Sequence, residues 1–108
     1  MSEMNVSEMM KAIPEHFNSE KAKGISGVVQ CVFSGTQASN WLIRIEGQTC
    51  SVEEGRIDNA DLTIRADAVD GINVLTGKMD AMRAYMMGKI KVFGDLALGM
   101  KLTTLFDK

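Results

Sequence analysis

The stretch AYMMGKIKVFGD, residues 84–95, contains two changes of structural period. Its first residues end a short helix, which Gly88 closes because glycine readily adopts the left-handed conformation found after helices. Residues 89–94 then alternate between polar and apolar side chains, a pattern typical of a strand with one buried face. Asp95 is a candidate cap for a final helix that extends to Phe106. This stretch therefore predicts a helix, a strand and a second helix in direct succession.

The final helix carries apolar side chains on two of its faces. One stripe consists of large apolar residues, namely Leu98, Leu102, Leu105 and Phe106. The nearly opposite stripe consists of Leu96, Met100 and Thr103. A helix that covers one sheet needs only one apolar stripe. We therefore expect the second stripe to be buried against a neighbouring helix, a partner protein or a ligand, and ordinary packing remains open for each residue taken alone.

The residues before this stretch have helical periodicity from Asp67 onward. Asp67 is a candidate cap for a first helix, in which Val69, Ile72 and Leu75 face inward. Asp80 is a candidate cap for a second, shorter helix. The second helix carries a group of large apolar side chains, namely Met82, Tyr85, Met86 and Met87.

The middle of the chain alternates between apolar and polar side chains. The predicted strands cover residues 27–34, 41–46, 49–53 and 62–66. Each has one apolar and one more polar face, as an antiparallel sheet with one face in water requires. The dipeptide Gly47-Gln48 is a plausible hairpin turn between the second and third strands.

The N-terminal part of the chain is predicted to be helical. Val6, Met9, Met10 and Ile13 follow the spacing of an amphipathic helix. Ser7 is the candidate cap of this helix, and a short second helix is expected over residues 18–23. The order of helix, four strands, two helices, strand and helix indicates an α+β fold.

The composition is that of a small globular domain without a strong overall charge. The chain has 108 residues, 45% of them apolar, and a formal net charge of -2, so a nucleic-acid partner is not expected. Residues 1–70 contain 6 Lys/Arg and 11 Asp/Glu, whereas residues 71–108 contain 6 and 3. The positive C-terminal part indicates either a solvated face or a docking face for an anionic group, such as a membrane surface or a carboxylate.

Methionine is concentrated at the two ends of the sequence. Of the 9 methionines, four lie in residues 1–10 and five lie in residues 79–100. Methionine is flexible and polarisable, and it suits surfaces that adapt to irregular apolar partners. The alternative interpretation is that these side chains fill gaps in an ordinary core.

The sequence displays little catalytic chemistry. His16 is the only histidine, and no motif pairs it with a nucleophile. Cys31 and Cys50 lie in predicted strands, where a free cysteine usually acts as a small buried apolar residue. We therefore predict that the protein is not an enzyme and that it holds no cofactor and no metal ion. A secretory signal and a membrane-spanning run are not seen, so a cytoplasmic location is expected.

Several segments resemble the sterol carrier protein type 2 domain family. They are LTGK at residues 75–78, AYMMGKIKVFGD at 84–95, LALGMKL at 96–102 and, before them, DLTI at 61–64. A Thr-Gly-Lys after a helix, a Gly-Lys strand opening and a Gly-Asp helix start at these distances form a specific combination.

The resemblance implies one α+β domain over residues 1–108, with a five-stranded, mostly antiparallel sheet covered on one face by helices. It also implies an apolar tunnel between sheet and helices that binds fatty acids, fatty acyl-CoA, sterols or phospholipids non-covalently. Phe33, Trp41 and Ile43 would form the sheet wall of this tunnel. The complete set of implied ligand-binding residues is Phe33, Trp41, Ile43, Ile72, Leu75, Met82, Met86, Leu96, Met100 and Leu105.

We therefore expect a non-catalytic intracellular carrier of lipids or other hydrophobic small molecules. Such a carrier would also make transient contact with a membrane surface or a lipid-metabolising enzyme. The alternative is an accessory or interaction subunit that docks onto a lipid-metabolising enzyme.

Overall fold

The computed structural model describes residues 5–106, which form a five-stranded sheet and the helices that cover it. The elements are α1 (Val6–Ala12), the short 3-10 helix η1 (Ile13–His16), β1 (Gly27–Ser34), β2 (Ser39–Glu46), β3 (Thr49–Glu54), β4 (Leu62–Asp67), α2 (Ala68–Leu75), α3 (Ala81–Met86), β5 (Ile90–Gly94) and α4 (Leu96–Leu102). The predicted α+β class and the five strands are confirmed. Met1 and Met4 of the N-terminal methionine group lie outside the described residues.

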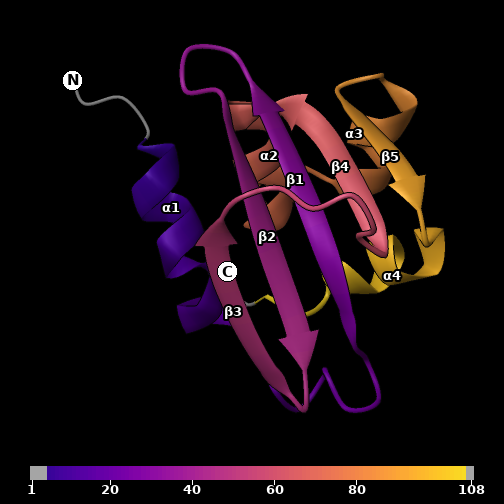
Figure 1. The fold of residues 1–108 in the computed structure, drawn as a ribbon. Helices are drawn as coiled ribbons and strands as arrows, with labels where there is room; N and C mark the ends of the chain where they lie inside the picture. Colours follow the sequence, from indigo (N-terminus) through magenta and orange to yellow (C-terminus); the bar gives the residue numbers. More distant parts are fainter. Residues whose placement is uncertain (1–4, 107–108) are drawn as a thin grey trace.

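The strands are arranged in the order β3-β2-β1-β4-β5, as Figure 1 shows. β1 pairs with β4 in parallel, and the other neighbours pair antiparallel. Gly47 and Gln48 join β2 to β3 with φ values of 56° and 63°, so the predicted tight turn is confirmed. The mostly antiparallel sheet is therefore confirmed, with one parallel pair at its centre.

One face of the sheet carries the hydrophobic core. Val29 of β1 lies opposite Ile43 of β2 on one side and Leu62 of β4 on the other, and all three side chains are buried. The helices cover this face in order, with α1 near β3, α2 behind the centre, and α3 and α4 beside β4 and β5 (Figure 1). The predicted cover on one face is thus confirmed.

A side-chain oxygen caps the start of each of the four α-helices described. Asn5, Asp67, Asp80 and Asp95 accept hydrogen bonds from the backbone N–H groups of Glu8, Val69, Arg83 and Leu98 at 2.9–3.0 Å. The three predicted aspartate caps are confirmed. The predicted Ser7 cap is wrong because the helix already includes Val6, and Asn5 occupies the capping position.

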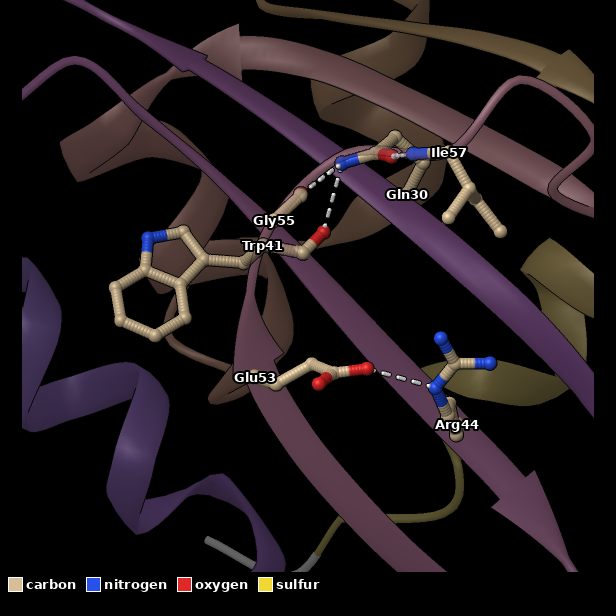
Figure 2. A network of polar contacts seen from close by, with 6 residues as sticks. All are labelled: Gln30, Trp41, Arg44, Glu53, Gly55 and Ile57. Atoms are coloured by element: carbon tan, nitrogen blue, oxygen red, sulfur yellow. Dashed lines mark hydrogen bonds and ion pairs between the residues drawn. The ribbon is translucent and has the colours of Figure 1, made fainter.

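The alternating pattern predicts an outer face of the sheet that is exposed to water, but part of this face is covered. The connection from β3 to β4 crosses this face, and the buried Gln30 of β1 holds it in place (Figure 2). The Gln30 Nε2 group donates to the carbonyl oxygens of Trp41 and Gly55 at 3.0 Å, and its Oε1 accepts from the Ile57 N–H at 2.8 Å. Leu42, also on this face, is buried as well.

Three further predictions are wrong. Val69 of α2 does not face inward, because 45% of its surface is exposed. Residues 18–23 form turns, not a helix, and the Ala22 N–H donates to the Ser19 carbonyl oxygen three residues back at 3.2 Å. The final helix ends at Leu102, before the predicted end at Phe106. Phe106 instead forms a β-bridge with Phe17, and their rings lie 5.8 Å apart. The chain therefore leaves α4 early to close the core beside the N-terminal segment.

Candidate functional site

An apolar pocket of about 160 Å³ lies between the β4–β5 end of the sheet and the helices beside it. β4 and β5 form one wall, and the end of α2, together with α3 and α4, forms the other. The lining residues are Leu62, Ile64, Val74, Leu75, Ala81, Met82, Tyr85, Ile90, Val92, Leu96, Gly99, Met100, Leu102 and Thr103. The structure thus shows a pocket at this end of the sheet, and the apolar tunnel implied by the family resemblance stays a prediction.

A second hollow of about 290 Å³ adjoins the first at its rim and includes Gly77 and Asp80. The two share a partition made of Val74, Ala81, Met82, Met100 and Thr103. The methionine side chains of this partition are unbranched and flexible, so they can change rotamer without moving the backbone.

Asp61 and Gly94 fix the position of α4 over the pocket. The Asp61 carboxylate accepts from the Val28 N–H at 2.8 Å, and the Asp61 carbonyl oxygen accepts from the Asp95 N–H at 2.8 Å. Gly94 has φ +106°, and a Cβ placed there would lie 2.5 Å from the Asp61 carbonyl oxygen. Only glycine therefore allows the end of β5 to approach β4 closely enough for this bond.

The mouth of the pocket is lined by large apolar side chains that remain in contact with water. Four pocket residues are at least half exposed, namely Met82, Tyr85, Leu96 and Met100. Leu96 and Met100 belong to the second apolar stripe predicted for the final helix, while Leu98 and Leu102 of the first stripe are buried. The second stripe thus borders the pocket and is exposed, whereas Leu105 and Phe106 of the predicted first stripe lie beyond the end of α4.

The pocket offers few polar atoms for chemistry. The only side-chain hydroxyls on its lining are those of Tyr85 and Thr103, and the Thr103 hydroxyl donates to the Met100 carbonyl oxygen at 3.3 Å. Within residues 5–106, no group of three or more His, Cys, Asp or Glu side chains could hold a metal ion. The arrangement suits an apolar guest that is bound by burial alone.

The two cysteines lie outside the pocket, in β1 and β3. Burial raises the pKa of the Cys31 thiol to about 12 and that of the half-buried Cys50 thiol to about 11. Both thiols are therefore protonated at neutral pH, which makes them poor nucleophiles.

The structure brings four of the ten predicted ligand-binding residues to the pocket, namely Leu75, Met82, Leu96 and Met100. It buries five others away from the pocket, in the packed part of the core, namely Phe33, Trp41, Ile43, Ile72 and Leu105. Met86 points to water with 77% of its surface exposed. Ligand contact by any of these ten residues stays a prediction.

The pocket lies beside other strands than the predicted sheet wall of Phe33, Trp41 and Ile43. Phe33, Trp41 and Ile43 belong to β1 and β2. α3 contacts β5, and α4 contacts both β4 and β5. The wall consists of Leu62, Ile64, Ile90 and Val92. Their inward positions were evident from the alternation, but the strand order that places them under the methionine-bearing helices was not.

Among the described residues, none of the helices has the length and hydropathy needed to span a bilayer.

A family model described as the SCP-2 sterol transfer family matches residues 8–107. The hydroxysteroid dehydrogenase-like protein 2 of Xenopus tropicalis is 36% identical over 102 residues, which make up 94% of this chain and 24% of that protein. The chain therefore spans about a quarter of the length of the curated relatives it matches.

Two solved structures show the same fold. The palmitated SCP2L2 of Aedes aegypti has a TM-score of 0.66 and 25% identity, and the match covers 96% of this chain and 93% of that one. The sec-alkylsulfatase Pisa1 from a Pseudomonas species has a TM-score of 0.84 and 17% identity over 97% of this chain, but the match covers only 17% of that enzyme. The fold thus occurs both as most of a small protein and as a minor part of a large one.

Proposed function

Because this chain belongs to the SCP-2 sterol transfer family, we propose that it is a non-catalytic carrier that binds the acyl chain of a lipid in the pocket beside β4 and β5. Lipid binding and transfer is the general role of the family. The observation that carries the proposal here is the apolar pocket with exposed apolar residues at its mouth. Fatty acids and lipids with a single inserted chain are the ligands that best suit it.

The pocket is large enough for part of an acyl chain, but not for a whole long acyl chain. A cavity of about 150 Å³ lined by apolar residues holds a guest of roughly the size of benzene. The pocket of about 160 Å³ therefore accepts only the end of a long acyl chain. Rotation of Met82 and Met100 would open the adjoining hollow to the rest of the chain, and burial yields about 0.8 kcal/mol per methylene group.

A relative supports an acyl chain as the guest. The SCP2L2 structure from Aedes aegypti is described as palmitated, and the match covers nearly all of both chains. We transfer this ligand class to the present chain as part of the proposal.

A second candidate function follows from the relatives of greater length. Hydroxysteroid dehydrogenase-like protein 2 is about four times as long as the matched segment, so its matching part is one portion of a larger protein. The second candidate function is therefore that of an accessory subunit, which docks onto a lipid-metabolising enzyme and holds a lipid for it. Co-elution with such an enzyme would support this role, and a chain that transfers lipid between vesicles unaided would contradict it.

The proposed location is the cytoplasm. Cys31 and Cys50 are both free, which suits a reducing compartment.

The test of the carrier function is direct measurement of ligand binding. We expect native mass spectrometry of gently purified protein to detect co-purified acyl lipid, and a fluorescent fatty acid to bind in titration. Met100→Lys should weaken this binding about tenfold or more, because it places a charge between the two hollows.

Met87→Lys is the matched control for this variant. Met87 is 60% exposed, similar to Met100 at 65%, but it lines neither hollow. Protein that is empty and does not take up the fluorescent fatty acid would refute the carrier function. Equal weakening by both variants would refute the assignment of the pocket.

A further inference from the structure

The exposed apolar side chains of this protein are concentrated around the mouth of the pocket. Of the eight large apolar side chains that are exposed in residues 5–106, seven lie between residues 82 and 100. Met82, Tyr85, Leu96 and Met100 line the pocket itself. Met86, the most exposed at 77%, lies one helical turn from Met82 on α3. We call these five residues the mouth surface, and such a contiguous apolar surface usually marks a contact site.

Basic side chains accompany the mouth surface. In the sequence, Arg83 follows Met82 and Lys101 follows Met100. Lys78 lies between Gly77 and Met79 of the second hollow, and Lys89 immediately precedes β5. All four are exposed.

These basic side chains are available to an external anion. The two ion pairs among residues 5–106 are Lys23–Glu20 and Arg44–Glu53, the latter drawn in Figure 2, so none of the four has a carboxylate within 4.0 Å. The nearby carboxylates of Asp80 and Asp95 accept hydrogen bonds from the backbone of their own helices. Residues 78–101 nevertheless contain five Lys/Arg and two Asp/Glu, so the formal net charge of this segment is positive.

We propose that the mouth surface docks onto an anionic lipid bilayer, with its apolar side chains in the interfacial region and the four basic side chains against lipid headgroups. This inference builds on the proposed function, since a carried lipid would pass between pocket and bilayer without crossing water. Apolar side chains flanked by cations have the composition of surfaces that lie in a bilayer interface. Positive charge is complementary to the negative surface of membranes that contain phosphatidylserine.

The side chains of the mouth surface favour a fluid partner over a folded one. Three of the five are methionines, which have no fixed shape and adapt to irregular apolar surroundings. Tyr85 combines an apolar ring with a polar hydroxyl, which is the character of residues found at the membrane–water interface.

The first test is flotation of the full chain with vesicles. We expect binding to vesicles of phosphatidylcholine with about 30% phosphatidylserine, and weak binding to pure phosphatidylcholine. Raising the salt concentration from about 0.1 M to about 0.5 M should weaken binding, because the Debye length shortens. Protein that does not float with phosphatidylserine vesicles at low salt would overturn the inference and leave the mouth surface to a protein partner.

The second test separates the apolar and basic contributions. Arg83→Glu/Lys101→Glu should reduce vesicle affinity by roughly tenfold or more, since each cation near the surface contributes about a fivefold effect. Lys11→Glu/Lys21→Glu makes the same charge change on exposed residues of the N-terminal segment. It should reduce affinity much less, and an equal reduction would overturn the inference.

Met86→Asp distinguishes docking from ligand binding. Met86 lines neither hollow, so the variant should keep its affinity for a fluorescent fatty acid in the absence of vesicles. Its vesicle affinity should decrease about fivefold or more, because a carboxylate enters the interface poorly. Unchanged vesicle affinity would overturn the docking inference. Wild-type protein that floats with vesicles but binds no fatty acid would instead refute the proposed function and keep the docking surface.

Discussion

The two ends of the sheet carry similar apolar side chains but differ in what covers them. At the β3–β2–β1 end, residues such as Ile43 and Val29 are fully buried beneath α1 and α2. At the β4–β5 end, Ile64 and Val92 border the pocket, whose other wall comes from the end of α2 and from α3 and α4. The difference shows that the pocket comes from the cover and not from the sheet.

The helices at the β4–β5 end place flexible side chains at the pocket. Met82 of α3 and Met100 of α4 both line it and are more than half exposed. α2, with 8 residues, packs Gly71 directly against the ring of Phe33. Close packing of the helix backbone at the centre and loose methionine cover at the edge therefore divide one core into a solid part and a hollow part.

The largest expected effect is on the free energy of unfolding. Replacing an isoleucine by alanine at each end of the sheet tests the division into a solid and a hollow part. Ile43→Ala should lower the free energy of unfolding by about 4 kcal/mol, because it opens a cavity in the solid part of the core. Ile64→Ala should cost about 2 kcal/mol, because Ile64 already borders empty space and makes fewer contacts there. Urea denaturation measures both values, and equal losses would break the comparison.

A smaller change in the free energy of unfolding is expected when Gly71 of α2 or Gly99 of α4 is replaced by alanine. A Cβ on Gly71 would lie 2.4 Å from Cε1 of the buried Phe33 ring, so Gly71→Ala should lower the free energy of unfolding by about 1.5 kcal/mol despite its better helix propensity. A Cβ on Gly99 would lie 3.4 Å from Leu62 Cδ2 in the pocket.

Gly99→Ala is therefore expected to leave stability unchanged or to raise it by up to about 1 kcal/mol. Thermal denaturation of both variants sharpens the comparison, since only the solid part should reject the extra methyl group. Destabilisation by Gly99→Ala as large as that by Gly71→Ala would show that α4 packs as tightly as α2.

The smallest effect concerns the thiols of the solid part. Burial raises the pKa of Cys31 to about 12 and that of Cys50 to about 11, so both favour the protonated form in the folded state. The stabilisation is complete below the pKa of the unfolded chain, near 9, and is lost as pH rises toward 11 and 12. Cys31 should account for a loss of roughly 0.5 kcal/mol between pH 7 and pH 9.

Denaturation at a series of pH values measures this loss. Cys31→Ala should flatten the decrease in stability above pH 8. An unchanged pH profile would show that water reaches this thiol in the folded protein.

Local patterns predicted the five strands and the four α-helices, but they did not predict which strands lie side by side. Alternation at Trp41 and Ile43 predicted an inward face, and the structure buries both side chains. The parallel pairing of β1 with β4 joins segments separated by a hairpin, and no local pattern encodes which strand lies beside which. The family resemblance predicted a five-stranded sheet with helices on one face. It did not predict which strands line the pocket, because that depends on the order of the strands in the sheet.

The pocket side of the helices was more predictable than the sheet side. The second stripe of the final helix marked Leu96 and Met100, and both line the pocket. The same reasoning missed Tyr85, because an aromatic residue among methionines gave no separate signal. It also missed the cover on the outer face, since the hydrogen bonds of Gln30 depend on a connection that follows two strands later.

Gln30 also has a consequence for how the strands find their alignment. Side chains alternate along β1, so a shift of one residue would turn the Gln30 amide into the apolar interior and leave it without partners. The amide meets the carbonyl oxygens of Trp41 and Gly55 and the N–H of Ile57 only when β1, β2 and the crossing connection are all in register. A single glutamine thus disfavours sheets in which the strands pair out of register, because it would be buried there without hydrogen-bond partners.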